Sequence, residues 1–491
     1  MKKNMSYIHF AIGLAIMVGF RFIPLGVLPN VTAVGLSVLG VFIGTIYMWS
    51  TIDPGVASLT SICMLCFSGF APTAGVLQQC FGNPVVTQMF FLMVFMGGLT
   101  DRRLTVYIAR WIMTRKFIEG KPWVFTLVML LGTYVMSVFI GAFAPIFLFW
   151  PVLYGVFEEV GYKPGDKYPT IMLIAIVVAA LVGFPVPPYM SNGLALLGNY
   201  RGLIANNFTS LATMPGVMVS NASYFIGCFT LGLILIAAVV LVMKLVFKPD
   251  VTPLKQVTIE MLERNPLPPM NNSQKTYGVF LGIFVFVMLV PSLLPNLPVL
   301  SFLNANSLVL ATVLVTALAL INFDEEGPVL RFGPVMGQHF SWPTYFLCVS
   351  AILIGSVLTA ESTGITPFLN TILAPIFNGM SGFTFTVVLL LVCIVLTNIS
   401  NSLVIGMILQ PVVLTYCATA NVNPAPIITL LIFTVLLSAA CTPAASPFAA
   451  MLFGNKKWLA SGDVYKYSLT IVAVETVIII ALGIPFINIL L

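Results

Sequence analysis

Long apolar runs alternate with short polar loops along the whole chain. Most of the runs have the length of about 20 residues that a transmembrane helix needs. Uninterrupted runs occupy 8–28, 32–50, 54–72, 84–100, 216–246, 276–296, 306–323, 343–360 and 466–491. Because only helices and closed barrels satisfy their backbone hydrogen bonds in lipid, this pattern predicts an all-α polytopic membrane protein.

Four further apolar runs are interrupted near their centres. The first-half runs are 122–158, interrupted at Gly141 and Pro145, and 168–200, interrupted by the segment FPVPPYMSN. The second-half runs are 383–417, interrupted at Ser400–Ser402, and 425–455, interrupted by the segment CTPAASP. We interpret 122–158 and 383–417 as re-entrant hairpins and 168–200 and 425–455 as broken spans, which predicts about 11 transmembrane helices in total.

The longest polar stretch, 247–275, lies near the midpoint and divides the chain into two similar halves. Residues 1–246 and 276–491 each contain spans, an amphipathic segment (101–121 or 361–382), a hairpin and a broken span, in that order. Interrupted segments at matching positions of two halves are typical of inverted-repeat transporters, with the binding site at the membrane midplane. We therefore predict two inverted repeats joined by a cytoplasmic linker.

Basic residues support one orientation of this topology. With the N-terminus in the cytoplasm, the segments that carry most of the Lys and Arg all fall inside, namely 101–121, 158–167, 247–275, 324–342 and 455–466. Arg201 is the one basic residue that this topology places in an external loop. The C-terminus is then expected outside.

Composition excludes other classes of protein. The chain is 59% hydrophobic and only 7% charged, whereas soluble domains carry about 25% charged residues. The basic residues that give the chain its net charge of +6 lie in short loops. This distribution is the one that membrane topology requires, and it does not indicate a nucleic-acid partner. Cys63 and Cys66 form a CxxC inside an apolar run, and we interpret them as core residues.

The polar residues at the second-half interruptions suggest a binding site. Asn, Ser and Thr side chains are costly in a bilayer unless they line a cavity, hold a ligand or join helices. Prolines at 443 and 447 remove backbone donors and leave carbonyls that could coordinate a monovalent cation, while helix N-termini favour an anion. The alternatives are a polar contact between two helices and a simple proline kink.

Several motifs resemble the divalent anion:sodium symporter family of dicarboxylate carriers. The tip Ser400-Asn401-Ser402 resembles the family's Ser-Asn-Thr, and PAASPFAAMLFG (443–454) resembles its second unwound loop. STIDPGVASLTS, GGLTDRRLTVYIARW and LTAESTGITPFL resemble other segments of the family in the same order. The first tip departs from the pattern, because Gly141-Ala142-Phe143 replaces the polar triplet.

This resemblance implies sodium ions as coupling ions and a homodimer in the cytoplasmic membrane of a bacterium. With the pattern of interruptions, it indicates substrate contacts at Asn401, Ser402, Ser191, Asn192, Ser446, Pro447, Pro188 and Phe143. The sodium site of the second half would use Ser400, Asn401, Thr442 and Ala445, and a degenerate first site would use Gly141, Ala142 and Pro187. The lost polar side chains of the first tip predict weakened or altered sodium coupling.

The sequence thus favours a secondary active transporter of small organic anions, with C4-type dicarboxylates preferred, acting as a sodium symporter or an exchanger. A cation/proton antiporter is the alternative, and it requires a titratable carboxylate near the membrane midplane. We predict that no span carries one. A membrane enzyme would need a cluster of His, Asp and Glu in or near a span, and the sequence lacks one. The two hairpins would also fit a channel, but the inverted repeat with a central linker favours alternating access.

Overall fold

The computed structural model describes residues 2–262, 267–294, 296–323, 327–368, 371, 379–399, 401–443 and 445–491. The first half consists of α1 (Lys2–Gly19), α2 (Ala33–Thr51), α3 (Pro54–Cys66), α4 (Thr73–Phe81), α5 (Pro84–Asp101), α6 (Leu104–Met113), α7 (Pro122–Ile140), α8 (Phe143–Glu159), α9 (Lys167–Gly183), α10 (Ser191–Asn206) and α11 (Asn221–Val242).

The second half begins with two short pieces of the linker, the 3₁₀ turn Thr252–Gln256 and α12 (Ile259–Leu262). It continues with α13 (Asn272–Leu293), α14 (Pro298–Ala305), α15 (Ser307–Leu320), α16 (Phe332–Pro334), α17 (Trp342–Leu358), α19 (Gly382–Thr397), α20 (Ser402–Ala420), α21 (Pro424–Leu437), α22 (Pro447–Gly454), α23 (Ser461–Ile478) and α24 (Ile484–Leu490). The strands β1 (Asn322–Phe323) and β2 (Gly327–Pro328) form a small antiparallel pair.

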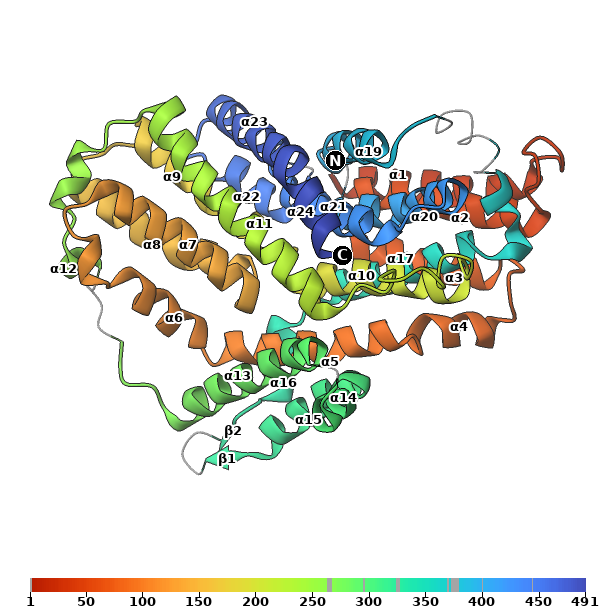
Figure 1. Cartoon of the computed structure of the whole chain (residues 1–491), viewed down its shortest axis with the longest axis horizontal. Coiled ribbons are helices and arrows are strands. Elements are labelled where there is room, and N and C mark those ends of the chain that lie inside the picture. Colours follow the sequence, from red (N-terminus) through yellow and green to blue (C-terminus); the bar gives the residue numbers. More distant parts are fainter. Residues whose placement is uncertain are drawn as a thin grey trace.

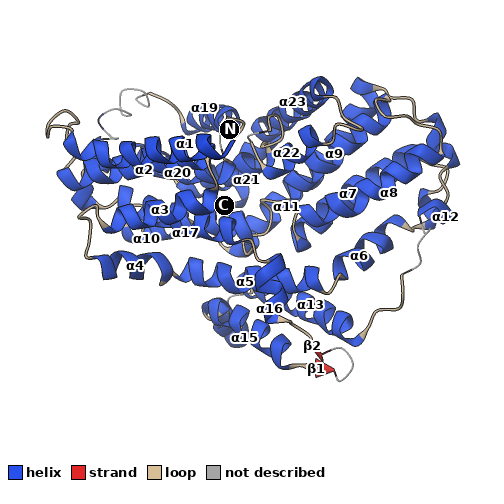
Figure 2. Cartoon of the chain, turned by 180° about the vertical axis from the view of Figure 1, so that it is seen from behind, coloured by secondary structure: helices blue, strands red, loops and turns tan. Residues whose placement is uncertain are grey.

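The helices form three groups (Figure 1). One group packs α7, α8, α9 and α11 together, and another packs α1, α2, α3, α10, α17 and α20. The third group lies along one edge, where α13, α15 and α16 pack with α5, and the two strands lie beside them, as the view from behind also shows (Figure 2).

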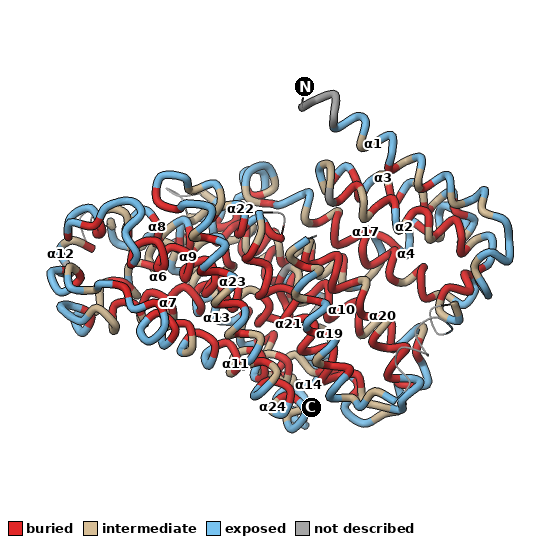
Figure 3. Tube along the Cα trace, turned by 90° about the horizontal axis from the view of Figure 1, so that it is seen from above, coloured by how far each residue is buried: buried red, intermediate tan, exposed pale blue. Residues whose placement is uncertain are grey.

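The first helices of the two broken spans, α9 and α21, lie at the centre of the molecule. Every residue of α21 is buried, as is every residue of α9 after Lys167, and the two helices pack against each other. A helix that is apolar all round is expected in such a position. Figure 3 shows this buried interior, with exposed residues on the outer helices. The halves of the chain therefore meet through the helices that carry the interruptions.

The predicted class, an all-α multi-pass membrane protein, is confirmed, whereas the number of full-length spans is lower than expected. Among the described residues, six helices are long and apolar enough to cross a membrane, or up to eight if each of two bent helix pairs is one span. Several expected spans correspond to shorter apolar helices, such as the 13-residue α3 and the 14-residue α21. Turns shorten these helices, and where an apolar run contains no proline or polar cluster, its hydropathy does not show where the helix ends.

The two predicted hairpins form pairs of connected helices. Residues Gly141 and Ala142 join α7 to α8, and these helices pack against each other. In the second half, residues 398–401 join α19 to α20, which also pack together. The predicted broken spans end their first helices at Gly183 and Leu437, close to the expected positions. In the first half the second helix, α10, continues to Asn206, six residues beyond the predicted end.

The interruption between α7 and α8 depends on a glycine. Gly141 has φ 114° and ψ 153°, a conformation that residues with a side chain rarely adopt. A Cβ atom added there would meet no other atom within 4 Å, so the requirement comes from the backbone alone.

We expect Gly141→Ala to lower the free energy of unfolding by about 1–3 kcal/mol because of this backbone strain. Gly155→Ala is the matched control, because Gly155 lies inside α8 with equally open surroundings and a helical backbone, where alanine is favoured. Thermal melting of both purified variants checks the prediction. Equal melting temperatures for the two variants would contradict it.

Candidate functional site

Asn398 holds the second hairpin tip against the second broken span. Its amide nitrogen donates to the carbonyls of Ile394 and Ser438 at 2.8 and 2.9 Å, and its side-chain oxygen accepts from the Cys441 N–H at 2.9 Å. The Thr442 hydroxyl donates to the Asn398 carbonyl at 2.5 Å. One asparagine therefore satisfies backbone groups that the interruption after α21 leaves without helical partners.

Two predicted substrate ligands cap helices. The Asn401 side-chain oxygen accepts from the N–H groups of Leu403 and Val404 at 3.0 and 3.5 Å, at the start of α20. The Ser446 hydroxyl accepts from the Ala449 N–H at 3.1 Å at the start of α22, and it donates to the Ala439 carbonyl at 2.6 Å. Both residues thus fix a helix N-terminus in place.

The other predicted residues of the second half lie around these caps. Ser402 is the first residue of α20 and is buried, Ala445 is buried, and Pro447 begins α22 with an exposed ring. Ser400, predicted as a sodium ligand, lies outside the described residues.

The first hairpin tip reaches the second broken span through aromatic contacts. The ring of Phe143, the first residue of α8, lies 4.2 Å from the ring of Phe448 in α22, measured between centroids. Phe184, at the first interruption, lies 5.3 Å from the same ring. Ala142 is buried, and Phe143 is 42% exposed. Phe448 therefore brings the first tip and the first interruption to the start of α22.

The start of α10 lies level with the start of α20. The Asn199 amide donates to the Gln410 side-chain oxygen at 2.7 Å, and the Gln410 amide donates to the Leu196 carbonyl at 2.9 Å. Leu196 also packs against Gly406. These contacts pair the two helices in parallel register, so the predicted residues at positions 191 and 192 lie at the same end as Asn401 and Ser402.

The loop between α9 and α10 is buried. Pro185, Pro187 and Pro188 have little exposure, and the Tyr224 hydroxyl donates to the Pro185 carbonyl at 2.8 Å. The side-chain oxygen of Asn192 is buried without a hydrogen-bond partner among the described residues. An unpaired buried oxygen of this kind is available to a ligand. Ser191 begins α10, and its side chain lies outside the described part of the structure.

One hydrogen bond close to the hairpin tip occurs at matching positions in both halves. The Ser137 hydroxyl donates to the Ala180 carbonyl at 2.6 Å, joining α7 to α9. The Thr397 hydroxyl donates to the Val435 carbonyl at 2.9 Å, joining α19 to α21. In each half a hydroxyl four residues before Gly141 or Asn401 ties the first hairpin helix to the helix that precedes the interruption.

Helix ends dominate the electrostatics of this region. The N-termini of α8 and α22 meet through Phe143 and Phe448, and those of α10 and α20 share a register. Each N-terminus carries a partial positive charge that favours an anion. The carbonyl and hydroxyl oxygens of Asn398 and Thr442 form an oxygen-rich group suited to a hard monovalent cation, whereas the tip Gly141-Ala142 contributes no polar side chain.

Glu475 overturns the prediction that no span carries a carboxylate. It lies midway along the candidate span Ser461–Leu490 and is 1% exposed. The signal was present in the sequence, because Glu475 is the single charge in the apolar run from Ser468 to Leu491. The side chain of Asp101, at the end of α5, is also buried, at 6% exposed, and it pairs with Arg331 at 2.7 Å.

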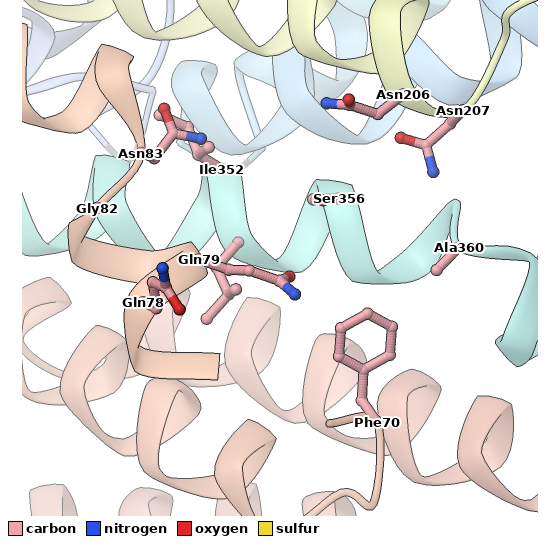
Figure 4. A pocket seen from close by; sticks show the side chains of 11 residues that line it. Phe70, Gln78, Gln79, Gly82, Asn83, Asn206, Asn207, Ile352, Ser356 and Ala360 are labelled. Atoms are coloured by element: carbon pink, nitrogen blue, oxygen red, sulfur yellow. The ribbon is translucent and has the colours of Figure 1, made fainter. Parts of the chain in front are cut away.

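A cavity of about 490 Å³ lies away from the tips. Its walls come from the region of α4, the end of α10 and the second half of α17 (Figure 4). Neutral amides contribute much of the lining, namely Gln78, Gln79, Asn83, Asn206 and Asn207. None of the predicted ligands lines this cavity, but α10 connects the two places, since it starts at the interruption and ends at the cavity.

No protein-family model and no curated protein matches the sequence. The fold is similar to that of the YdaH transporter of Alcanivorax borkumensis, whose crystal structure is described as having an unusual topology. The TM-score is 0.57 at 14% sequence identity, over 88% of this chain and 99% of that chain. The likeness establishes the fold alone, and no family model supports the resemblance to the divalent anion:sodium symporter family.

We expect Asn398→Ala to destabilise the protein by about 1–3 kcal/mol for each buried backbone group left unpaired, namely the Cys441 N–H and the Ser438 carbonyl. Asn488→Ala is the control, because Asn488 bonds only locally to Ile484 within α24 among the described contacts. Denaturation of the two variants in detergent gives the comparison. If Asn398→Ala loses no more stability than Asn488→Ala does, Asn398 does not stabilise the interruption after α21.

Proposed function

We propose that this protein is a secondary active transporter of small organic anions, with C4-type dicarboxylates as its substrates. The observation that carries the proposal is the meeting of both hairpin tips with both interrupted segments around the starts of α8, α10, α20 and α22. Helix N-termini can bind carboxylates without a fixed positive charge, and the amide groups of Asn192 and Asn401 lie among them. The similarity of the fold to that of a transporter supports a transport function, and it does not support an enzymatic function.

Alternating access fits the repeated construction of the chain. We propose that residues 1–246 and 276–491 are inverted repeats, joined by a cytoplasmic linker, with the N-terminus inside and the C-terminus outside. The paired contacts Ser137–Ala180 and Thr397–Val435 support this division. Each hairpin would then move with its broken span in an elevator or rocking motion. A homodimer in a bacterial cytoplasmic membrane remains part of the proposal through the family resemblance.

We propose coupling to sodium or exchange of one anion for another. The second half offers the better cation site, with oxygens from Asn398, Asn401, Thr442 and Ala445, while Gly141, Ala142 and Pro187 could contribute backbone carbonyls alone. A cation/proton antiporter is the second candidate, and Glu475 favours it, since that activity needs a buried carboxylate. Sodium-driven proton movement in liposomes without any organic anion would identify the antiporter.

Uptake of labelled succinate into proteoliposomes tests the transporter. We expect uptake under an inward sodium gradient or with succinate loaded inside, and Asn401→Ala should abolish it. Because this variant also loses a helix cap worth about 0.5–2 kcal/mol, Asn401→Ser serves as a second variant that keeps the cap and removes the amide. Loss of uptake in both variants assigns the amide to the substrate or ion.

Two further variants complete the experiment. Asn304→Ala, on the exposed surface of α14, should transport as the unmodified protein does. Ala142→Asn restores a polar side chain to the first tip and should leave transport intact or change its sodium dependence. Liposomes that move no succinate under either condition would reject the proposed substrate class.

A further inference from the structure

Glu475 is buried in the membrane-spanning part of the chain without a partner. Neither carboxyl oxygen has a hydrogen bond to any described residue, and the side chain is 1% exposed. Glu475 is 14 residues from the start of α23, or about 21 Å along the helix. The group therefore lies deep within a hydrocarbon layer of about 30 Å.

No charged group of the described residues pairs with Glu475. The helices α9, α11 and α22 pack against α23. Their titratable residues are Lys167 and Tyr168 in the first turn of α9, and Tyr224 and Cys228 on α11, which are hydrogen-bonded to each other. The segment PFAAMLFG of α22 contains no titratable residue. Within the described residues, the thiol of Cys441 lies near the carboxyl group of Glu475.

An ionised carboxylate in such a place needs a cation. Burying it alone costs far more free energy than a hydrogen bond returns, so a bound cation must neutralise it. Metal ions require several oxygen or nitrogen ligands. Among the described residues, no group of three or more His, Cys, Asp or Glu side chains could hold a metal ion, and no hydrogen-bonding group lies against either carboxyl oxygen of Glu475. A proton needs no further ligand.

Cys441 connects Glu475 to the proposed transport site. Its thiol lies near Ser468, two turns before Glu475 on α23, and its N–H donates to the side-chain oxygen of Asn398. Cys441 itself lies in the interruption between α21 and α22. A movement of the interruption between α21 and α22 therefore changes which groups lie next to Glu475.

We propose that Glu475 is the proton-carrying group of this transporter, protonated in the present conformation and ionised when a movement of the chain around Cys441 admits water. The carboxylate takes its proton from water on one side of the membrane and releases the same proton to water on the other side. The inference rests on the proposed transport function and adds the proton as a coupling ion.

Infrared spectroscopy of the purified protein at neutral pH tests the protonation without any substrate. The unmodified protein and Glu361→Gln, at an exposed position, should show the carbonyl band of a protonated carboxyl group, whereas Glu475→Gln should lack it. An identical carboxyl band in all three proteins overturns the inference. Thermal melting verifies that Glu475→Gln, which preserves the shape of a neutral acid, is folded.

Succinate transport in proteoliposomes tests the coupling. Acidic external pH should accelerate uptake by the unmodified protein and by Glu361→Gln, while for Glu475→Gln the ratio of rates at acidic and alkaline external pH should fall to about 1. Exchange of internal for external succinate should persist in Glu475→Gln, because the neutral side chain mimics the protonated state. An unchanged pH ratio in Glu475→Gln overturns the inference. If no variant moves succinate, the proposed substrate is wrong, and the infrared band alone decides whether Glu475 holds a proton.

Discussion

The need to pair every backbone amide and carbonyl within a membrane governs this structure. An interrupted helix leaves several of these groups without partners, and each such group costs free energy when it is buried. The chain meets this need with a few side chains, above all Asn398, whose amide joins the end of α19 to Ser438 and Cys441. Without these bonds, a helix interrupted inside the bilayer would be unstable.

The two halves accommodate the backbone groups at their interruptions with different side chains. In the second half, polar side chains at Asn398, Asn401 and Ser446 bond to the backbone. In the first half, the tip Gly141-Ala142 relies on glycine geometry, and Phe143 contributes a ring that packs on Phe448. Polar side chains are therefore concentrated in the second half, while the first half contributes an aromatic surface and the buried oxygen of Asn192.

Much of the candidate site could be predicted because interruptions of apolar runs are visible along the chain. The positions of both tips and both broken spans follow from Gly141, Pro187, Asn401 and the prolines around Ser446. The roles of individual side chains could not be predicted equally well. A Ser or Asn at a helix start can cap the helix or bind a ligand, and only the positions of neighbouring N–H groups distinguish the two roles.

The sequence by itself determined the class of protein and the positions of the four interruptions, because hydropathy and proline content are local properties. The tertiary structure decided which interruptions meet, since Phe448 contacts Phe143 and Phe184, which are far from it along the chain. It also decided that Glu475 has no hydrogen-bond partner among the described residues and that Asp101 is paired with Arg331. Burial and pairing depend on which helices pack together, and this is a property of the whole fold.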